Sequence, residues 1–215
     1  MKYNEESAQK VADFLLQIKA VKLNAENPFT WASGLKSPIY CDNRITLSYP
    51  KVRDFIKDEF AKVIKNAFET PDVIAGVATG GIAQGALVAQ EFDKPFVYIR
   101  PSQKSHGLEN KIEGVVEPGQ QVVVIEDLVS TGKSSLNAVD ALKKADCKVL
   151  GMVAIFSYNL DKALENFKKA GVKLFTLSDY ESLIRKALEI KYISDEDHNS
   201  LVEWRKNPQK WAEKF

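Results

Sequence analysis

Four consecutive β-branched residues, Val122-Val123-Val124-Ile125, constrain the fold of this 215-residue chain more than any other stretch. A short run that is apolar at every position is typical of a strand buried on both faces, and such strands belong to parallel sheets covered by helices. The neighbouring sequence agrees, because strand and helix patterns alternate from Asp72 as far as Leu177. The sequence therefore predicts an α/β fold with a mostly parallel central sheet flanked by helices.

The expected elements can be placed by residue number. No repeat or linker divides the chain, so we expect a single domain over residues 1–215, with about 1–49 forming an N-terminal hood segment. Ser178 and Glu181 match a capping box at the start of one helix. The pattern predicts helices near 5–18, 50–68, 82–92, from 134, 161–170, from 178 and 194–204, and strands near 39–41, 73–78, 96–99, 122–125, 148–157 and 172–177.

The buried run leads directly into polar residues that suit a ligand. Glu126 and Asp127 follow it, and the turn Ser130–Ser134 then opens into a helix pattern. The free backbone N–H groups at the start of a helix bind phosphate well. Carboxylates accept hydrogen bonds from sugar hydroxyls or bind magnesium. A phosphate site beside a polyol site predicts a ribose phosphate ligand.

The sequence of this corner allows two other interpretations. Gly132-Lys133-Ser134 looks like the end of a nucleotide-triphosphate P-loop, but that motif requires a glycine five positions before Gly132, where Asp127 stands. An ordinary polar turn is the other interpretation. Two adjacent acids at the end of a buried strand are not needed for packing, so we favour the ligand site.

Two more segments are expected at the same edge of the sheet. Val77–Gly81 repeats the order of strand, small turn and helix, and its glycines serve either a second anion site or close packing. Roughly twenty residues without periodicity separate Arg100 from the strand at Gln121. Long loops of this kind often cover active sites. We call residues 100–120 the lid segment; it carries Lys104 and His106.

Composition narrows the class of protein. Thirty basic residues against 29 acidic ones leave no excess positive charge for general nucleic-acid binding. The chain shows neither a targeting segment nor an apolar run long enough to cross a membrane. Cys41 and Cys147 lie far apart without metal-binding spacing, so we expect a cytoplasmic setting and no zinc site.

Together, these motifs resemble the phosphoribosyltransferases, which carry an acidic pair for phosphoribosyl pyrophosphate. Residues 100–107 are similar to the lid loop of the orotate phosphoribosyltransferases, and residues 29–40 to their N-terminal substrate segment. The resemblance covers nearly the whole chain. It implies a type I phosphoribosyltransferase fold and a pentosyltransferase that moves ribosyl phosphate from phosphoribosyl pyrophosphate (5-phospho-α-D-ribose 1-diphosphate) to orotate. The products would be orotidine 5′-phosphate and diphosphate, in pyrimidine (UMP) biosynthesis.

The resemblance also implies roles for individual residues. The acidic pair would hold the ribose hydroxyls, the following turn the 5-phosphate, and the lid segment the diphosphate. A homodimer would share its two sites, and Mg²⁺ would be bound by the substrate without a dedicated protein ligand. The implied catalytic residues are Lys104, His106 and Asp127; those for phosphoribosyl pyrophosphate are Arg100, Lys104, His106, Glu126, Asp127, Leu128, Val129, Ser130, Thr131, Gly132, Lys133 and Ser134; and Ser130 would also lie near orotate.

The chain departs from another branch of the family around the base. Ala32 and Gly80 stand where that branch has substrate-side lysines, and Pro101 where a lysine follows the lid arginine. Tyr158 and Asn159 occupy the region of an expected arginine. These departures leave the contacts to orotate open.

Lys36 and Arg44 are candidates to balance the carboxylate of orotate, and both could equally be solvated surface charges. Two other functions share the acidic pair. One is a purine phosphoribosyltransferase, and the other is a regulator that senses phosphoribosyl pyrophosphate without catalysis. Such a regulator should carry a basic helix-turn-helix, for which the N-terminal helix has little positive charge.

Overall fold

The computed structural model describes residues 2–31, 33–102 and 111–215. Within these residues the central sheet has six strands in the order β10-β9-β8-β5-β6-β7. Neighbouring strands are parallel except for the antiparallel pair β6 and β7. The prediction of a mostly parallel sheet is confirmed. The strands are β5 (Val73–Val77), β6 (Phe96–Ile99), β7 (Ile112–Glu113), β8 (Gln121–Val129), β9 (Lys148–Ser157) and β10 (Leu174–Asp179).

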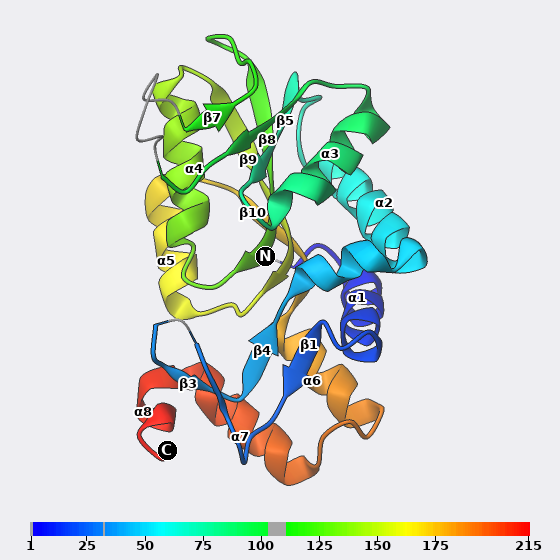
Figure 1. Ribbon diagram of the computed structural model, residues 1–215, viewed down its shortest axis with the longest axis vertical. Coiled ribbons are helices and arrows are strands. Elements are labelled where there is room, and N and C mark those ends of the chain that lie inside the picture. Colours follow the sequence, from blue (N-terminus) through cyan, green and yellow to red (C-terminus); the bar gives the residue numbers. More distant parts are fainter. Residues whose placement is uncertain (1, 32, 103–110) are drawn as a thin grey trace.

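Helices cover both faces of this sheet, as the buried run in β8 predicts (Figure 1). Val122 and Val124 pack in one apolar layer, and Val123 and Ile125 in the other. All four side chains are fully buried. The first layer includes residues of α4 (Lys133–Lys144) and α5 (Asp161–Ala170), and the second includes residues of α1 (Glu5–Gln17), α2 (Pro50–Ala67) and α3 (Gly81–Phe92).

The hood segment lies beside the C-terminal helices, in the lower half of Figure 1. In the hood segment, β1 (Val21–Leu23) pairs with β4 (Ile39–Cys41), β2 (Phe29–Thr30) pairs with β3 (Lys36–Ser37), and η1 (Asn43–Ser48) is a 3₁₀ helix. The C-terminal helices are α6 (Tyr180–Glu189), α7 (Asp195–Lys206) and α8 (Pro208–Ala212). Trp204 of α7 packs edge-on against Trp31, with ring centroids 5.6 Å apart. A C-terminal helix therefore packs against the β2–β3 hairpin.

Among the strands of the central sheet, β8 and β7 differ most from the sequence prediction, whereas β10 lies two residues later than expected. β8 continues past Ile125 to Val129, because the ten-residue β9 keeps pairing with it up to Ser157. β7 forms within the lid segment, where no regular structure was expected, and pairs with β6. The described residues on either side of 103–110 are held together, since the N–H of Arg100 donates to the backbone oxygen of Lys111 at 2.9 Å. Residues 103–110, which include Lys104 and His106, lie outside the described residues.

The predicted capping box at Ser178 is wrong by one residue. Ser178 is still part of β10, and its buried hydroxyl donates to the backbone oxygen of Ala8 at 2.9 Å. Asp179 caps α6 instead, since its carboxylate accepts from the N–H of Ser182 at 2.9 Å. Tertiary contact with α1 decides between two neighbouring residues that both have suitable side chains.

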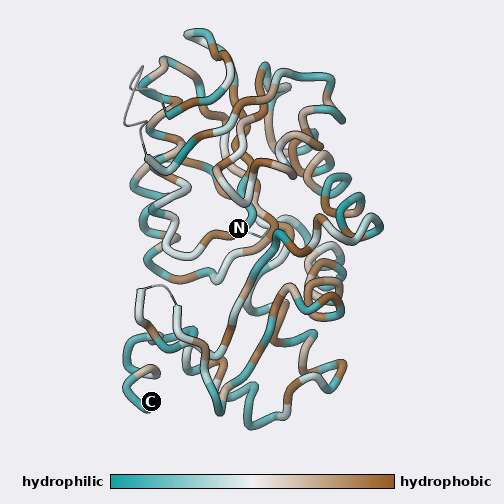
Figure 2. Tube along the Cα trace, in the orientation of Figure 1, coloured by the Kyte–Doolittle hydropathy of each residue, from teal (hydrophilic) through white to brown (hydrophobic). Residues whose placement is uncertain are grey.

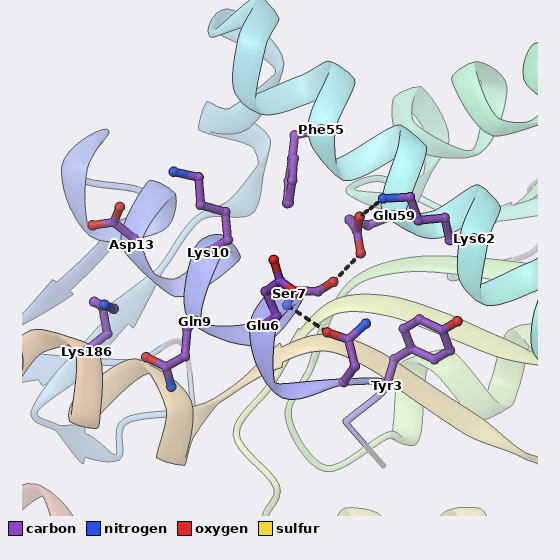
Figure 3. A pocket seen from close by; sticks show the side chains of 11 residues that line it. Tyr3, Glu6, Ser7, Gln9, Lys10, Asp13, Phe55, Glu59, Lys62 and Lys186 are labelled. Atoms are coloured by element: carbon purple, nitrogen blue, oxygen red, sulfur yellow. Dashed lines mark hydrogen bonds and ion pairs between the residues drawn. The ribbon is translucent and has the colours of Figure 1, made fainter.

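A buried carboxylate ties α1 to α2 in a hollow lined by both helices and by α6 (Figure 3). The hydroxyl of Ser7 donates to Glu59, which is only 3% exposed, and the Lys62 ammonium pairs with the same carboxylate at 2.5 Å. These contacts compensate the carboxylate for loss of water. They fix the helix layer on this face of the sheet.

Hydrophobic residues run along the central strands, and hydrophilic ones are concentrated on the outer turns of the helices (Figure 2). Among the described residues, no helix combines the length and apolarity needed to cross a bilayer.

Candidate active site

The carboxyl edge of the sheet opens onto a cleft of about 390 Å³. Ligands of parallel α/β sheets bind at this edge. Two larger hollows, of about 840 Å³ beside α1 and 910 Å³ beside α6, are lined neither by the acidic pair nor by the Val77–Gly81 turn. The smaller cleft is therefore the candidate active site. Its lining comes from the hood segment, the turn after β5, the end of β8 and the start of α4: Cys41, Asp42, Arg44, Val77, Ala78, Thr79, Gly80, Glu126, Asp127, Leu128 and Ser134.

The two acids of the cleft have different surroundings. Glu126 is 4% exposed; its carboxylate accepts from the Ser135 hydroxyl at 2.7 Å and from the N–H of Asp127 at 3.0 Å. Burial, and then the neighbouring charge of Asp127, raise the pKa of Glu126 well above its usual range. Asp127 is only partly buried. The strand therefore anchors one carboxyl group in the protein and presents the other to the cleft.

Two glycines allow α3 to start against this strand. A Cβ atom at Gly80 would lie 2.1 Å from carboxylate atoms of Asp127, and one at Gly81 would lie 2.4 Å from the backbone oxygen of Ile125. Neither distance is possible for a real side chain. The packing interpretation of the Val77–Gly81 turn is therefore confirmed, and its role in binding an anion stays a prediction. A larger residue at position 80 would displace Asp127 from its observed position.

The turn between β8 and α4 requires glycine at position 132. Its φ angle is +76°, and a Cβ atom there would lie 2.7 Å from the ring of Phe167. Thr131, Lys133 and Ser134 are all exposed, and of these Ser134, in the first turn of α4, lines the cleft. Backbone N–H groups in a first helical turn have no partner within the helix. This end of α4 can therefore donate hydrogen bonds to an anion.

The remaining predicted residues of the phosphoribosyl site take different positions. Leu128 lines the cleft, but the side chain of Val129 is fully buried in the core. Ser130 directly follows β8 and is partly buried. The Arg100 guanidinium pairs with Glu113 at 3.3 Å on the β6–β7 hairpin and does not line the cleft. The sheet thus brings together the acidic pair and the start of α4, while Arg100 is held apart from them.

Among the described residues, Arg44 is the one basic residue that lines the cleft. Its guanidinium makes two hydrogen bonds to the Asp42 carboxylate, at 2.7 and 2.8 Å. Lys36 instead donates to Thr30 on the β2–β3 hairpin, at 3.0 Å. A guanidinium that already holds one carboxylate in this way has the geometry to hold another.

Two residues lie in the region of the expected arginine. Tyr158 is 3% exposed, and its ring centroid lies 5.1 Å from that of Trp31. Asn159 donates to the Asp179 carboxylate at 3.1 Å. Tyr40, the other aromatic candidate for stacking on a base, is 44% exposed beside Phe29.

Several residues of the site carry no signal that sequence reasoning used. Ser135 and Asn43 hold the acidic pair, since the side-chain amide of Asn43 donates to the backbone oxygen of Asp127 at 2.6 Å. Cys41 and Asp42 line the cleft from the hood segment. No group of three or more His, Cys, Asp or Glu side chains within the described ranges is arranged to hold a metal ion.

Known proteins share both the sequence and the fold of this chain. Residues 47–182 match the family model described as Phosphoribosyl transferase domain. Orotate phosphoribosyltransferase from Porphyromonas gingivalis is 56% identical over 94% of this chain and 96% of its own length. The enzyme of that name from Listeria monocytogenes is 53% identical over 95% and 98%, respectively. The crystal structure of orotate phosphoribosyltransferase from Aeropyrum pernix superimposes with a TM-score of 0.75, at 26% identity, over 86% of this chain and 99% of that one.

The matched region contains the β8 acidic pair, the glycine turn before α3 and the start of α4. More than half of all aligned residues are shared with relatives that are covered almost end to end. The fold predicted from the buried strand and the cleft at its carboxyl edge are thus those of the phosphoribosyltransferases, and this chain belongs to that family, in its orotate phosphoribosyltransferase branch.

Proposed function

We propose that this chain transfers the ribosyl phosphate group of phosphoribosyl pyrophosphate to orotate, giving orotidine 5′-phosphate and diphosphate in pyrimidine biosynthesis. The observation that carries this proposal is the cleft in which Glu126 and Asp127 meet the start of α4. The names of the close relatives supply orotate as the acceptor. We further propose that residues 1–215 act as one domain in the cytoplasm.

The proposed reaction is a displacement at the anomeric carbon of ribose. A ring nitrogen of orotate forms the new bond to this carbon, and the bond to the diphosphate oxygen breaks, so that diphosphate leaves with the electron pair. The proton of that ring nitrogen is passed to the departing diphosphate. Positive charge develops on the ribose as the bond breaks. The carboxylate of Asp127 would accept hydrogen bonds from the ribose hydroxyls and stabilise that charge. The turn Ser130–Ser134 would hold the 5-phosphate through backbone N–H groups and fix the ribose for attack.

The cleft suits a substrate that carries Mg²⁺. Carboxylate oxygens are ligands that Mg²⁺ prefers, and it is usually bound by one or two of them together with substrate phosphates. Asp127 presents such oxygens to the cleft beside the proposed ribose. When bound, Mg²⁺ would neutralise charge on the leaving diphosphate. We propose that substrate oxygens provide most of its ligands.

The lid segment would complete the site. We propose that Arg100, Lys104 and His106 contact the diphosphate, across a homodimer in which each lid covers the partner's cleft. Lys104 and His106 lie outside the described residues, so this role rests on the family resemblance. A charge pair 4 Å apart gains about 1 kcal/mol in bulk water and about 4 kcal/mol at an effective dielectric of 20. A lysine that acts on diphosphate is therefore most effective when the lid excludes water.

Arg44 is the proposed partner of the orotate carboxylate. Arg44→Gln should raise the KM for orotate about tenfold or more, because a charge-assisted hydrogen bond to a carboxylate is lost. The KM for phosphoribosyl pyrophosphate should change less than threefold. Steady-state kinetics with each substrate varied in turn would measure both. Lys36→Gln, outside the cleft, is the matched control, and an equal rise in that variant would remove Arg44 from the base site.

A panel of acceptors tests the function itself. Turnover with orotate, and none with hypoxanthine, adenine or xanthine, is the expected result. The purines should not react because they lack the carboxylate that Arg44 would bind. A preference for one of them would make the chain a purine phosphoribosyltransferase. Binding of phosphoribosyl pyrophosphate without turnover of any base would favour a sensor.

A further inference from the structure

We infer that Asn43 is a positioning residue, which holds the backbone of Asp127 so that its carboxylate faces the cleft. This inference rests on the proposed function, because it concerns the residue that would contact the ribose. Asn43 belongs to η1 in the hood segment and is 1% exposed. Its side-chain amide donates to the backbone oxygen of Asp127 at 2.6 Å, across 84 residues of sequence.

The end of β8 needs this contact because the neighbouring strand has already ended. The pairing of β5 with β8 stops at Gly76 and Ile125, whereas β8 runs on to Val129. On the other side, β9 pairs with Glu126 and Leu128. The N–H of Asp127 donates to the Glu126 carboxylate, and its backbone oxygen accepts from Asn43. The side chains of Glu126 and Asn43 thus make the hydrogen bonds to the backbone of Asp127 that a longer β5 would make.

Asn43 is itself held from two sides. Its side-chain oxygen accepts from the Cys41 thiol at 3.3 Å, and its backbone oxygen accepts from the Thr46 hydroxyl at 2.6 Å. Thr46 in turn accepts from Gln84 of α3 at 3.4 Å, and both residues are buried. The network therefore joins η1, α3 and β8 behind the cleft. Within this network the Asn43 amide has a partner for both its oxygen and its nitrogen, which favours one orientation of that side chain.

The position of Asn43 also links the two halves of the proposed site. Asp42 and Arg44, its direct neighbours, line the cleft from the hood segment. Residues 42–44 thus include Arg44, the proposed partner of the orotate carboxylate, and Asn43, which holds Asp127 beside the proposed ribose. A small displacement of a catalytic group can cost about a hundredfold in rate. We therefore assign Asn43 to the alignment of Asp127 with the phosphoribosyl substrate.

A double-mutant cycle with Asp127 tests this assignment. Asn43→Ala should lower kcat/KM for phosphoribosyl pyrophosphate between about tenfold and a hundredfold, and the KM for orotate should change less. In the Asp127→Asn background the same substitution should cost less than threefold, because the group that it positions is already lost. Thr46→Val removes the hydroxyl that donates to the backbone oxygen of Asn43. It should lower kcat/KM for phosphoribosyl pyrophosphate by a smaller factor, and again by less in the Asp127→Asn background. If Asn43→Ala does not fold, Thr46→Val takes its place in the double-mutant cycle.

Ser7→Ala is the matched control, because it removes a buried hydrogen bond between α1 and α2 away from the cleft. It should lower the midpoint of urea unfolding and leave both KM values unchanged. Equal losses from Asn43→Ala in the wild-type and Asp127→Asn backgrounds would overturn the assignment, as would wild-type kinetics in Asn43→Ala. A wild-type chain without activity toward orotate would instead reject the proposed function.

Discussion

Asp127→Asn should lower kcat/KM for phosphoribosyl pyrophosphate by at least about a hundredfold while the protein keeps its fold. Asparagine has nearly the shape of aspartate, so the backbone contacts of residue 127 with Asn43 and Glu126 can remain. What disappears is the negative charge. At about 5 Å and an effective dielectric near 20, a unit charge on the ribose gains about 3 kcal/mol from a carboxylate. A difference of that size in the transition state corresponds to roughly two powers of ten in rate.

Single-turnover and steady-state assays would separate the effect of this substitution on binding from that on chemistry. We expect a large fall in the single-turnover rate, with substrate still bound at millimolar concentration. Asp140→Asn, on the exposed surface of α4, is the matched control and should retain activity within about twofold. If Asp127→Asn keeps a kcat/KM within threefold of the wild type, charge stabilisation by Asp127 is not part of the mechanism.

The fold could be predicted from the sequence because the central strands carry a strong local signal. Val122–Ile125 is apolar at every position, and the structure divides these residues between the two helix layers as a doubly covered sheet requires. The start of α2 at Pro50 was equally clear. β7 is only two residues long, too short for any periodic pattern, and it was therefore missed.

The candidate site was predictable only where it is local. Glu126, Asp127 and the turn that follows are contiguous, so their shared position follows from one strand and one helix start. Asn43 reaches the same point from 84 residues away, and nothing in its neighbourhood distinguishes it from a capping or turn residue. From the sequence alone, Gly80 was consistent with either a second anion site or close packing. The structure shows that close approach to Asp127 requires a glycine there.

Glu126→Gln should make the metal-free protein more stable at neutral pH. In the folded chain, burial raises the pKa of Glu126, so that the folded protein holds a proton which the unfolded chain releases near pH 4.5. From that pH upward, wild-type stability falls until the buried carboxyl group has also ionised. Each pKa unit of this difference corresponds to about 1.4 kcal/mol. Glutamine never ionises, so the variant lacks this loss.

The advantage of the glutamine variant should therefore be small below about pH 4.5, increase as the pH rises, and become constant above the folded pKa of Glu126. Urea unfolding at several pH values, with a chelator present, would measure this difference. Glu165→Gln, on the exposed surface of α5, should change the free energy of unfolding by no more than about 0.5 kcal/mol at any of them. A wild-type protein as stable as Glu126→Gln at pH 8 would show that Glu126 is stabilised as a carboxylate by Ser135 and the N–H of Asp127.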